Sequence, residues 1–284
     1  MKQLDGFKWF SLSVTWFWLA IFALVPFSLV LMTSFLSHDE RHLAELPLTL
    51  ANYRGLYDSL YFQIFARSFS LAGLCSFFCL LLGYPFAYLL SRLSVKAKGF
   101  FVLLIVIPFW TSSLIRSYAL IAILKAKGLL NLSLLGLGLI DKPLPILYTN
   151  TAVMIGLIYN LLPFMVLPIL SNIDRLDKRL VEAARDLGAD RFTIFRRIIL
   201  PLTMPGIVAG CTLVFLPAMT IFYIPDILGG AKSVLVGNLI QREFLVMHNW
   251  PAGSATSIVL TGFLALLVML YRKAAADKGG HEFL

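Results

Sequence analysis

Charged residues are scarce in this chain of 284 residues: Asp, Glu, Lys and Arg together make up 14%, whereas hydrophobic residues make up 59%. An ordinary soluble domain carries about 25% charged residues and has too little interior to bury so much apolar surface. A lipid bilayer can cover such a surface. The composition therefore excludes an ordinary soluble globular protein and predicts an all-α integral membrane protein.

Catalytic and nucleotide-binding motifs are also missing from the sequence. No G-x-x-x-x-G-K-[ST] segment is present, so the chain has no P-loop with which to bind ATP. No His, Asp and Glu residues are grouped with catalytic spacing. The cysteines Cys75, Cys79 and Cys211 lie in apolar runs without further ligand residues, which predicts packing rather than metal binding. We therefore expect a non-enzymatic protein without a catalytic, cofactor or metal site of its own.

Long apolar runs predict six transmembrane helices. The hydrocarbon core of a bilayer is about 30 Å thick, so each span needs about 20 residues. The runs cover residues 10–36, 68–91, 100–120, 151–170, 205–228 and 255–271. A further run, residues 129–140, is too short for a span and is predicted to form an interfacial or tucked helix. We expect one transmembrane domain over residues 1–284, with a polar loop over residues 171–204.

The distribution of cations predicts the orientation of the spans. With six spans, both termini lie on the same side of the membrane. Fifteen of the 24 Lys and Arg residues flank the spans on that side and nine flank them on the other. The positive-inside rule therefore places both termini and the loop of residues 171–204 in the cytoplasm. The formal net charge of +9 follows the membrane topology and does not indicate a nucleic-acid partner.

The first half of the loop has the pattern of a short amphipathic helix. Its apolar face is predicted to carry Leu176, Leu180, Ala183, Ala184 and Leu187. A second face is predicted to carry Lys178, Glu182 and Arg185. Gly188 follows, and glycine suits the left-handed position just beyond a helix end.

The second half of the loop predicts another helix. Asp190 is expected to cap its N-terminus, and the helix is expected to end near Pro201. Its apolar stripe is predicted to contain Phe192, Phe195, Ile198, Ile199 and Leu202. Two alternatives fit this pattern: a compact unit that docks with a partner, or an amphipathic loop that lies on the lipid headgroups.

The loop resembles the EAA loop of bacterial ABC-importer permeases. The resemblance rests on Glu182-Ala183-Ala184, three residues, Gly188, nine residues, Ile198, one residue and Leu200-Pro201. It implies a type I (MetI-like) permease fold in which this loop couples the membrane domain to a cytoplasmic ABC ATPase dimer. The coupling residues implied by the resemblance are Glu182, Ala183, Ala184, Arg185, Gly188 and Ala189.

Three further segments resemble the permeases that import spermidine and putrescine, most closely their B-type subunits. These segments are residues 108–118, 225–232 and 237–241. The resemblance implies a bacterial inner-membrane location and a second, non-identical permease subunit. It also implies a soluble polyamine-binding protein outside the membrane, with ATP and Mg bound by the partner ATPase and not by this chain.

A polyamine path through the membrane needs carboxylates or aromatic faces, because each ammonium loses its water and a cation–π contact returns roughly 0.5–2 kcal/mol. The candidates that combine these chemistries with a place at or within a span are Asp226, Trp110, Tyr223, Tyr118, Tyr159 and Asn160. The alternatives are a helix-end role for Asp226 and ordinary packing for the aromatic residues. Arg116 is expected to pair with a carboxylate, with Glu243 as a candidate, or to contact the binding protein.

Two other functions compete with polyamine import. An importer of the same class could carry another small cationic solute or ferric iron. An ion-coupled secondary transporter is a different class, but it favours carboxylates inside the spans. The centres of the six predicted spans contain none, and such a transporter would give the coupling loop no role.

Overall fold

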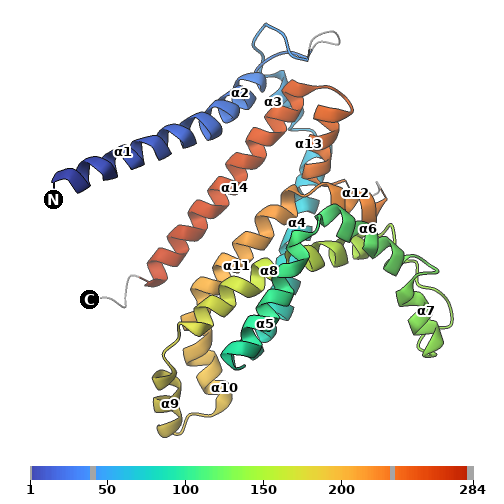
Figure 1. Ribbon diagram of the computed structural model, residues 1–284. Helices are drawn as coiled ribbons and strands as arrows, with labels where there is room; N and C mark the ends of the chain where they lie inside the picture. The colour runs from blue at the N-terminus through green and yellow to red at the C-terminus, as the bar shows by residue number, and fades with distance from the viewer. Residues whose placement is uncertain (1, 39–42, 231–233, 280–284) are drawn as a thin grey trace. The chain divides into compact units, whose positions relative to one another are not determined.

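The computed structural model of the chain describes residues 2–38, 43–230 and 234–279, and these residues are almost entirely helical (Figure 1). Their extended pairing is limited to one antiparallel bridge between Ser37 and Glu45. Residues 231–233, of which 231 and 232 belong to the polyamine-permease-like segment 225–232, and residues 280–284 of the C-terminus lie outside the described part. The chain forms two compact units, Met1–Phe62 with Leu239–Leu267 and Gln63–Asn238 with Val268–Leu284.

The described residues contain six helical stretches that are long and apolar enough to cross a membrane. They are Ser11–Thr33, Ser59–Ser91, Ser113–Gly136, Asn150–Asp174, Arg191–Thr220 and Trp250–Met269. The predicted all-α, six-span class is therefore confirmed. The limits of the third and fifth stretches differ from the sequence-based prediction.

The first unit begins with α1 (Lys2–Leu19), a π-helical turn η1 (Ala20–Leu24) and α2 (Val25–Thr33), followed by the short α3 (Ala51–Gly55). The side-chain amide of Asn52 donates to the carbonyl oxygens of Ser34 at 2.9 Å and Leu36 at 2.8 Å. It thereby ties α3 to the end of α2. The other helices of this unit are most of α13 (Val236–Leu245) and the first part of α14 (Trp250–Gly279), where the Phe244 and Trp250 rings meet at 5.9 Å.

The second unit is built around α8 (Asn150–Asp174) and α11 (Leu200–Thr220), and most of α4 (Ser59–Ser91) packs against them. A Cβ atom on Gly210 of α11 would lie 2.7 Å from the sulfur of Met165, so only glycine permits this close approach to α8. The hydroxyl groups of Tyr84 and Thr203 lie 3.0 Å apart and join α4 to α11. The interior is filled by fully buried apolar side chains, including Leu157, Met165, Ile169, Val214 and Met219.

The predicted span over residues 100–120 is not one continuous helix. The structure has α5 (Val95–Val106), a 3₁₀ turn η2 (Ile107–Trp110) and α6 (Ser113–Leu124), separated by extended backbone at Thr111. Pro108 has no N–H to donate to the preceding helical turn, which ends α5. The short helix predicted after α6 is present as α7 (Leu129–Gly136), and extended backbone at Lys125 and Gly128 separates it from α6.

The apolar run of residues 205–228 also divides into two helices. α11 ends at Thr220, Ile221 is extended, and α12 (Tyr223–Gly229) begins a new helix. Pro225 is four residues after Ile221 and cannot donate a hydrogen bond to its carbonyl oxygen, so an uninterrupted helix is disfavoured. The prediction of a single span to residue 228 is therefore corrected to a span followed by a separate short helix.

Candidate functional site

The first helix of the loop is α9 (Lys178–Asp186), and both of its ends are capped. At the N-terminus, the Asp177 carboxylate accepts a hydrogen bond from the Arg179 amide at 2.9 Å. At the C-terminus, Gly188 has a φ of +81°, and the Ala189 amide donates to the Ala184 carbonyl at 2.9 Å. This is the left-handed helix end predicted for Gly188. Its backbone geometry fixes the turn between α9 and the next helix.

The second helix of the loop begins with α10 (Arg191–Ile194) and continues through a π-helical turn, η3 (Phe195–Ile199), into α11. The predicted cap is confirmed, because the Asp190 carboxylate accepts a hydrogen bond from the Phe192 amide at 3.1 Å. The Thr193 hydroxyl also donates to this carboxylate and is the main cause that lowers the pKa of Asp190. The predicted end near Pro201 is wrong. Pro201 stands in the first turn of α11, where the missing N–H is tolerated after the wider π turn.

The predicted apolar face of α9 is divided between two environments. Ala184 is 8% exposed and packs in a small core with Ile194 and Ile199. Leu180 and Leu187, by contrast, are 48% and 88% exposed. The predicted stripe of the second helix divides in the same way, since Phe192 is exposed whereas Ile199 is buried. Ile194, which lay outside the predicted stripe, is also buried.

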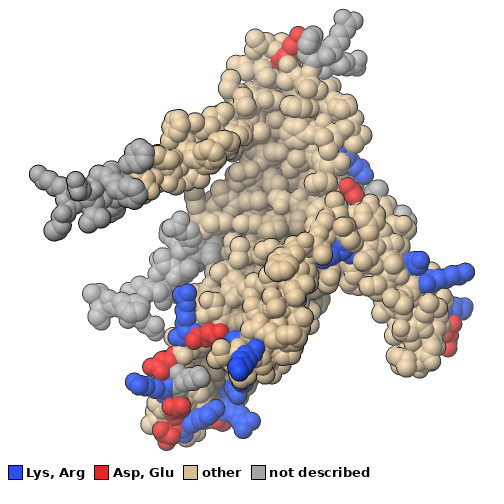
Figure 2. All heavy atoms as spheres, in the orientation of Figure 1, with Lys and Arg blue, Asp and Glu red and all other residues tan. Residues whose placement is uncertain are grey.

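The exposed members of α9 form an outward ridge, which we define as Leu180, Ala183 and Leu187. Their spacing of three and four residues places them on one side of the helix. Glu182, Arg185 and Gly188 are also exposed. Figure 2 shows acidic and basic side chains gathered at the end of the second unit that carries α9 and α10. The arrangement is an exposed apolar ridge beside charged groups. Ala184, on the same helix, packs against Ile194 and Ile199.

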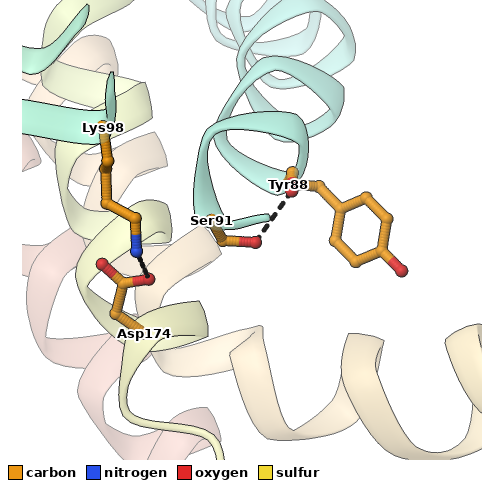
Figure 3. A network of polar contacts seen from close by, with 4 residues as sticks. All are labelled: Tyr88, Ser91, Lys98 and Asp174. Atoms are coloured by element: carbon orange, nitrogen blue, oxygen red, sulfur yellow. Dashed lines mark hydrogen bonds and ion pairs between the residues drawn. The ribbon is translucent and has the colours of Figure 1, made fainter. Parts of the chain in front are cut away.

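An ion pair that sequence reasoning missed supports the base of the loop. The ammonium nitrogen of Lys98, on α5, lies 2.7 Å from a carboxylate oxygen of Asp174, the last residue of α8 (Figure 3). The two side chains are 22% and 37% exposed. The pair joins residues 76 positions apart, so no local sequence pattern could have revealed it.

The path candidate Asp226 has a close partner in the structure. The side-chain amide of Asn238 donates to Asp226 Oδ1 at 2.7 Å and to the Phe222 carbonyl at 2.7 Å. Asn238 also accepts a hydrogen bond from the Leu235 amide at 3.2 Å. Asp226 is therefore a half-buried carboxylate with one oxygen fixed, at the start of a short helix. Asn238 lies in one of the polyamine-permease-like segments, but its role was not predicted.

The aromatic candidates lie in a second group. The guanidinium carbon of Arg116 lies 5.3 Å from the centroid of the Phe109 ring and 6.0 Å from that of Tyr159. Among the described residues, Arg116 Nε is buried and has no hydrogen-bond partner. The described contacts of Arg116 are therefore with aromatic faces and not with a carboxylate, whereas the alternative contact with the binding protein stays a prediction. Trp110 and Tyr118 are 80% and 60% exposed.

The two remaining path candidates have local contacts. Asn160 is 4% exposed, donates to the Gly156 carbonyl at 2.9 Å, and has an Oδ1 atom without a hydrogen-bond partner in the described chain. The ring of Tyr223 meets that of Phe222 edge to face at 6.1 Å. The described contacts thus connect Asp226 with Asn238, and Tyr159 with Arg116 and Phe109. They include none from Asp226 to Trp110, Tyr118 or Tyr159.

A buried carboxylate in the first unit was also missed. Glu243 of α13 is 2% exposed and accepts hydrogen bonds from the Tyr61 hydroxyl at 2.9 Å and the Thr256 hydroxyl at 3.0 Å. Burial raises the pKa of Glu243, and the two hydroxyl groups oppose that shift. Tyr61 is 182 residues away in sequence, so no local pattern indicates this contact. Glu243 therefore already has partners, although it was a candidate partner for Arg116.

The arrangement of six apolar stretches and a capped, charged loop matches a known class of membrane protein. Residues 79–276, which are more than half of the chain, match the family described as "Binding-protein-dependent transport system inner membrane component". The chain therefore belongs to this family of transport permeases and is a multi-pass inner-membrane protein.

Individual relatives narrow this class. The chain is 50% identical over 275 residues to the spermidine/putrescine transport system permease protein PotB of Haemophilus influenzae, covering 96% of each protein. It is 50% identical over 258 residues to PotB of Escherichia coli K12, covering 91% of this chain and 94% of that protein. The E. coli inner membrane ABC transporter permease protein YdcU is 29% identical over an alignment that covers 97% of this chain and 95% of that protein.

Solved structures share the fold. A chain of a bacterial ABC transporter involved in alginate import gives a TM-score of 0.78 at 17% identity, covering 97% of this chain and 96% of that chain. A chain of the MetNI methionine ABC transporter gives a TM-score of 0.55 at 14% identity, covering 78% and 99%. These likenesses confirm the predicted type I importer permease fold.

Proposed function

We propose that this chain is a permease subunit of an ATP-driven ABC importer that moves polyamines, spermidine or putrescine, from a soluble binding protein across the cytoplasmic membrane. The support for the substrate is the 50% identity to permeases named for spermidine and putrescine, over more than nine-tenths of this chain. The proposal treats residues 1–284 as one transmembrane domain with both termini and the loop of residues 171–204 in the cytoplasm. The chain itself is non-catalytic.

The observation that carries the coupling role is the ridge on α9. Leu180, Ala183 and Leu187 are exposed although the loop has its own small core around Ala184. An apolar ridge that a loop leaves uncovered is typical of a protein contact. We assign Ala183, Gly188 and Ala189 to the contact with the ATPase and Glu182 to its polar edge. The coupling role expected for Arg185 is indirect, because Arg185 lies on the opposite side of α9 from the ridge. Ala184 has a structural role in this proposal, because it packs α9 against Ile194 and Ile199.

This function requires partners. They are a cytoplasmic ABC ATPase dimer, which binds ATP and Mg, a second, non-identical permease subunit, and a periplasmic or extracellular polyamine-binding protein. A homologous arrangement is named in the structure of the alginate ABC transporter in complex with its periplasmic protein, to which this chain gives a TM-score of 0.77. The substrate path is proposed to include Asp226, Trp110, Tyr118, Tyr159, Asn160 and Tyr223.

Reconstituted uptake tests the substrate assignment. The importer is placed in proteoliposomes with ATP inside and its binding protein outside, and radiolabelled spermidine uptake is measured with unlabelled competitors. Competition by spermidine and putrescine, but not by another organic cation or ferric iron, is expected. Uptake of ferric iron without polyamine uptake would contradict the substrate while leaving the ABC class intact. Uptake driven by an ion gradient in the absence of ATP would contradict the class.

A further inference from the structure

A groove of about 590 Å³ lies behind the coupling helix, between the last turn of α4 and the helices α9 and α10. Three arginines from separate parts of the chain line it: Arg92 just after α4, Arg185 on α9 and Arg191 on α10. None of the described residues that line the groove is Asp or Glu. The groove is therefore a concave, cationic site, and the proposed coupling function does not use it as a binding site.

Only one of the three guanidinium groups has a described side-chain partner. Arg92 lies 4.5 Å from the centroid of the Tyr88 ring and donates a hydrogen bond to the Tyr88 hydroxyl. In the view of Figure 3, the Tyr88 ring points away from the Lys98–Asp174 pair. In the described chain, Arg185 and Arg191 have no carboxylate within ion-pair distance. Guanidinium groups are planar, multidentate donors that suit phosphate oxygens.

The rest of the lining is apolar. Ile194 is 3% exposed, whereas Leu89 and Phe192 are 63% and 67% exposed. A small inorganic anion would use the arginines and leave these apolar side chains in water. A ligand that carries both a phosphate and hydrocarbon chains would satisfy both parts of the lining.

The groove also lies at the ends of two membrane-spanning stretches. Tyr88 and Leu89 belong to the last turn of the stretch Ser59–Ser91, and Arg191 is the first residue of the stretch Arg191–Thr220. The site is thus formed where two membrane-spanning stretches end. Under the proposed topology, this end faces the cytoplasm, where anionic lipids attract basic residues and basic pockets between helices bind their headgroups.

The groove and the ridge occupy opposite sides of α9. Val181 and Arg185 line the groove, and their spacing of four residues places them on one face. Leu180, Ala183 and Leu187 lie roughly half a turn away from that face. A protein that covers the ridge therefore does not fill the groove, which favours a membrane ligand over a segment of the ATPase.

We propose that the groove binds one anionic phospholipid of the cytoplasmic leaflet, with its phosphate between Arg92, Arg185 and Arg191 and its acyl chains along Leu89 and Phe192. The bound lipid connects the end of α4 to the back of α9 and so stiffens the element that receives force from the ATPase. This inference rests on the proposed function for its orientation and its consequence. The binding of the lipid itself can be measured independently of transport.

The test uses the complete importer in nanodiscs of phosphatidylcholine, with and without phosphatidylglycerol. The groove variant is Arg92→Gln/Arg191→Gln. The matched control is Arg196→Gln/Arg197→Gln, which removes two exposed arginines from the same loop that do not line the groove. Native mass spectrometry measures retained phosphatidylglycerol, and the binding-protein-stimulated ATPase rate is measured on the same samples.

We expect the wild type and the control to retain one phosphatidylglycerol more strongly than the groove variant, by about tenfold or more for two lost charge-assisted contacts. The ATPase rate of the groove variant should no longer respond to phosphatidylglycerol. Equal retention by the groove variant and the control would overturn the proposal. A full response to inorganic phosphate in pure phosphatidylcholine would overturn it in favour of a free-anion site. An ATPase rate that does not respond to the spermidine-loaded binding protein, with normal lipid retention, would contradict the proposed function and not the lipid site.

Discussion

The coupling loop and the proposed substrate path differ in how they are built. The loop is formed by neighbours in sequence: Asp177, Gly188 and Asp190 set its helix ends through hydrogen bonds or backbone angles within a few residues. The path candidates lie on separate helices, and the nearest partners of Asp226 and Tyr159 come from other elements. Under the proposed function, the local sequence specifies the contact with the ATPase, whereas only the fold specifies the substrate path.

The largest effect is expected at Gly188. An Asp side chain at its φ of +81° strains the backbone by roughly 1–2 kcal/mol and places a charge beside the ridge. Gly188→Asp should reduce ATP-driven uptake by about tenfold or more, with normal membrane insertion because nothing lies within 4 Å of a Cβ there.

Gly138 provides the matched control for this prediction. It has a φ of +67° and equally open surroundings, but it lies beyond α7 and away from the loop. Gly138→Asp introduces the same strain and the same charge and should leave uptake close to wild type. Equal losses in the two variants would mean that strain, and not the place of the loop, explains the effect.

The next effect tests whether Asp226 belongs to the path. Asp226→Asn removes the charge but keeps the oxygen that accepts from Asn238. If the carboxylate contacts an ammonium group, the KM for spermidine uptake should rise by about tenfold, the scale of one charged hydrogen bond. Asp141→Asn, at an exposed acid on a loop, is the control. An unchanged KM would mean that Asp226 only joins α12 to α13 through Asn238. Asp226 would then not belong to the substrate path.

Glu243 offers a prediction about stability and pH. Its raised pKa means that the folded protein holds the proton more readily, so this contribution to stability is complete below the ordinary value of 4.5 and is lost as the pH rises through the raised pKa. Glu243→Gln should remove this pH dependence in thermal unfolding and leave Tm at pH 8 equal or higher. Glu243→Leu leaves two hydroxyl groups unpaired and should cost about 1–3 kcal/mol. A fall in Tm for both variants would contradict the assigned cause.

The smallest effect concerns the Lys98–Asp174 pair. Because its carboxylate side is more than a third exposed, the pair should contribute only about 0.2–1 kcal/mol. Asp174→Asn is expected to lower the ATPase coupling ratio by about twofold. Exchanging the charges, with Lys98→Asp and Asp174→Lys, should restore the ratio. No restoration would indicate that the individual side chains matter and the pair does not.

Features that depend on neighbouring residues were predicted from the sequence, and features that depend on distant residues were not. Apolar runs, the Asp190 cap and the Gly188 turn are local signals, and the structure confirms them. The breaks after Val106 and Thr220 are also local in cause, since Pro108 and Pro225 remove donors, but hydropathy alone does not register a missing N–H. The apolar runs of residues 100–120 and 205–228 were therefore each predicted as one span, although each contains a break in the helix.

Pairings between distant residues could not be predicted. The partners Lys98 and Asp174 lie far apart in sequence, as do Tyr61 and Glu243. The burial of Ala184 beside exposed Ala183 depends on where Ile194 and Ile199 fold back, which periodicity on α9 alone does not determine. The general place of the loop was therefore predictable, whereas the division of its residues into core and ridge required the structure.

The most direct test of the central claim is site-specific photo-crosslinking in the assembled importer. A photoreactive amino acid is placed at Leu187 on the ridge and, as a control, at Leu139, which is 66% exposed beyond α7. We predict an adduct with the ATPase from position 187, changing in yield between nucleotide-free and ATP-bound states, and none from position 139. Absence of an ATPase adduct at position 187 in every nucleotide state would contradict the claim that this loop receives the motor's force.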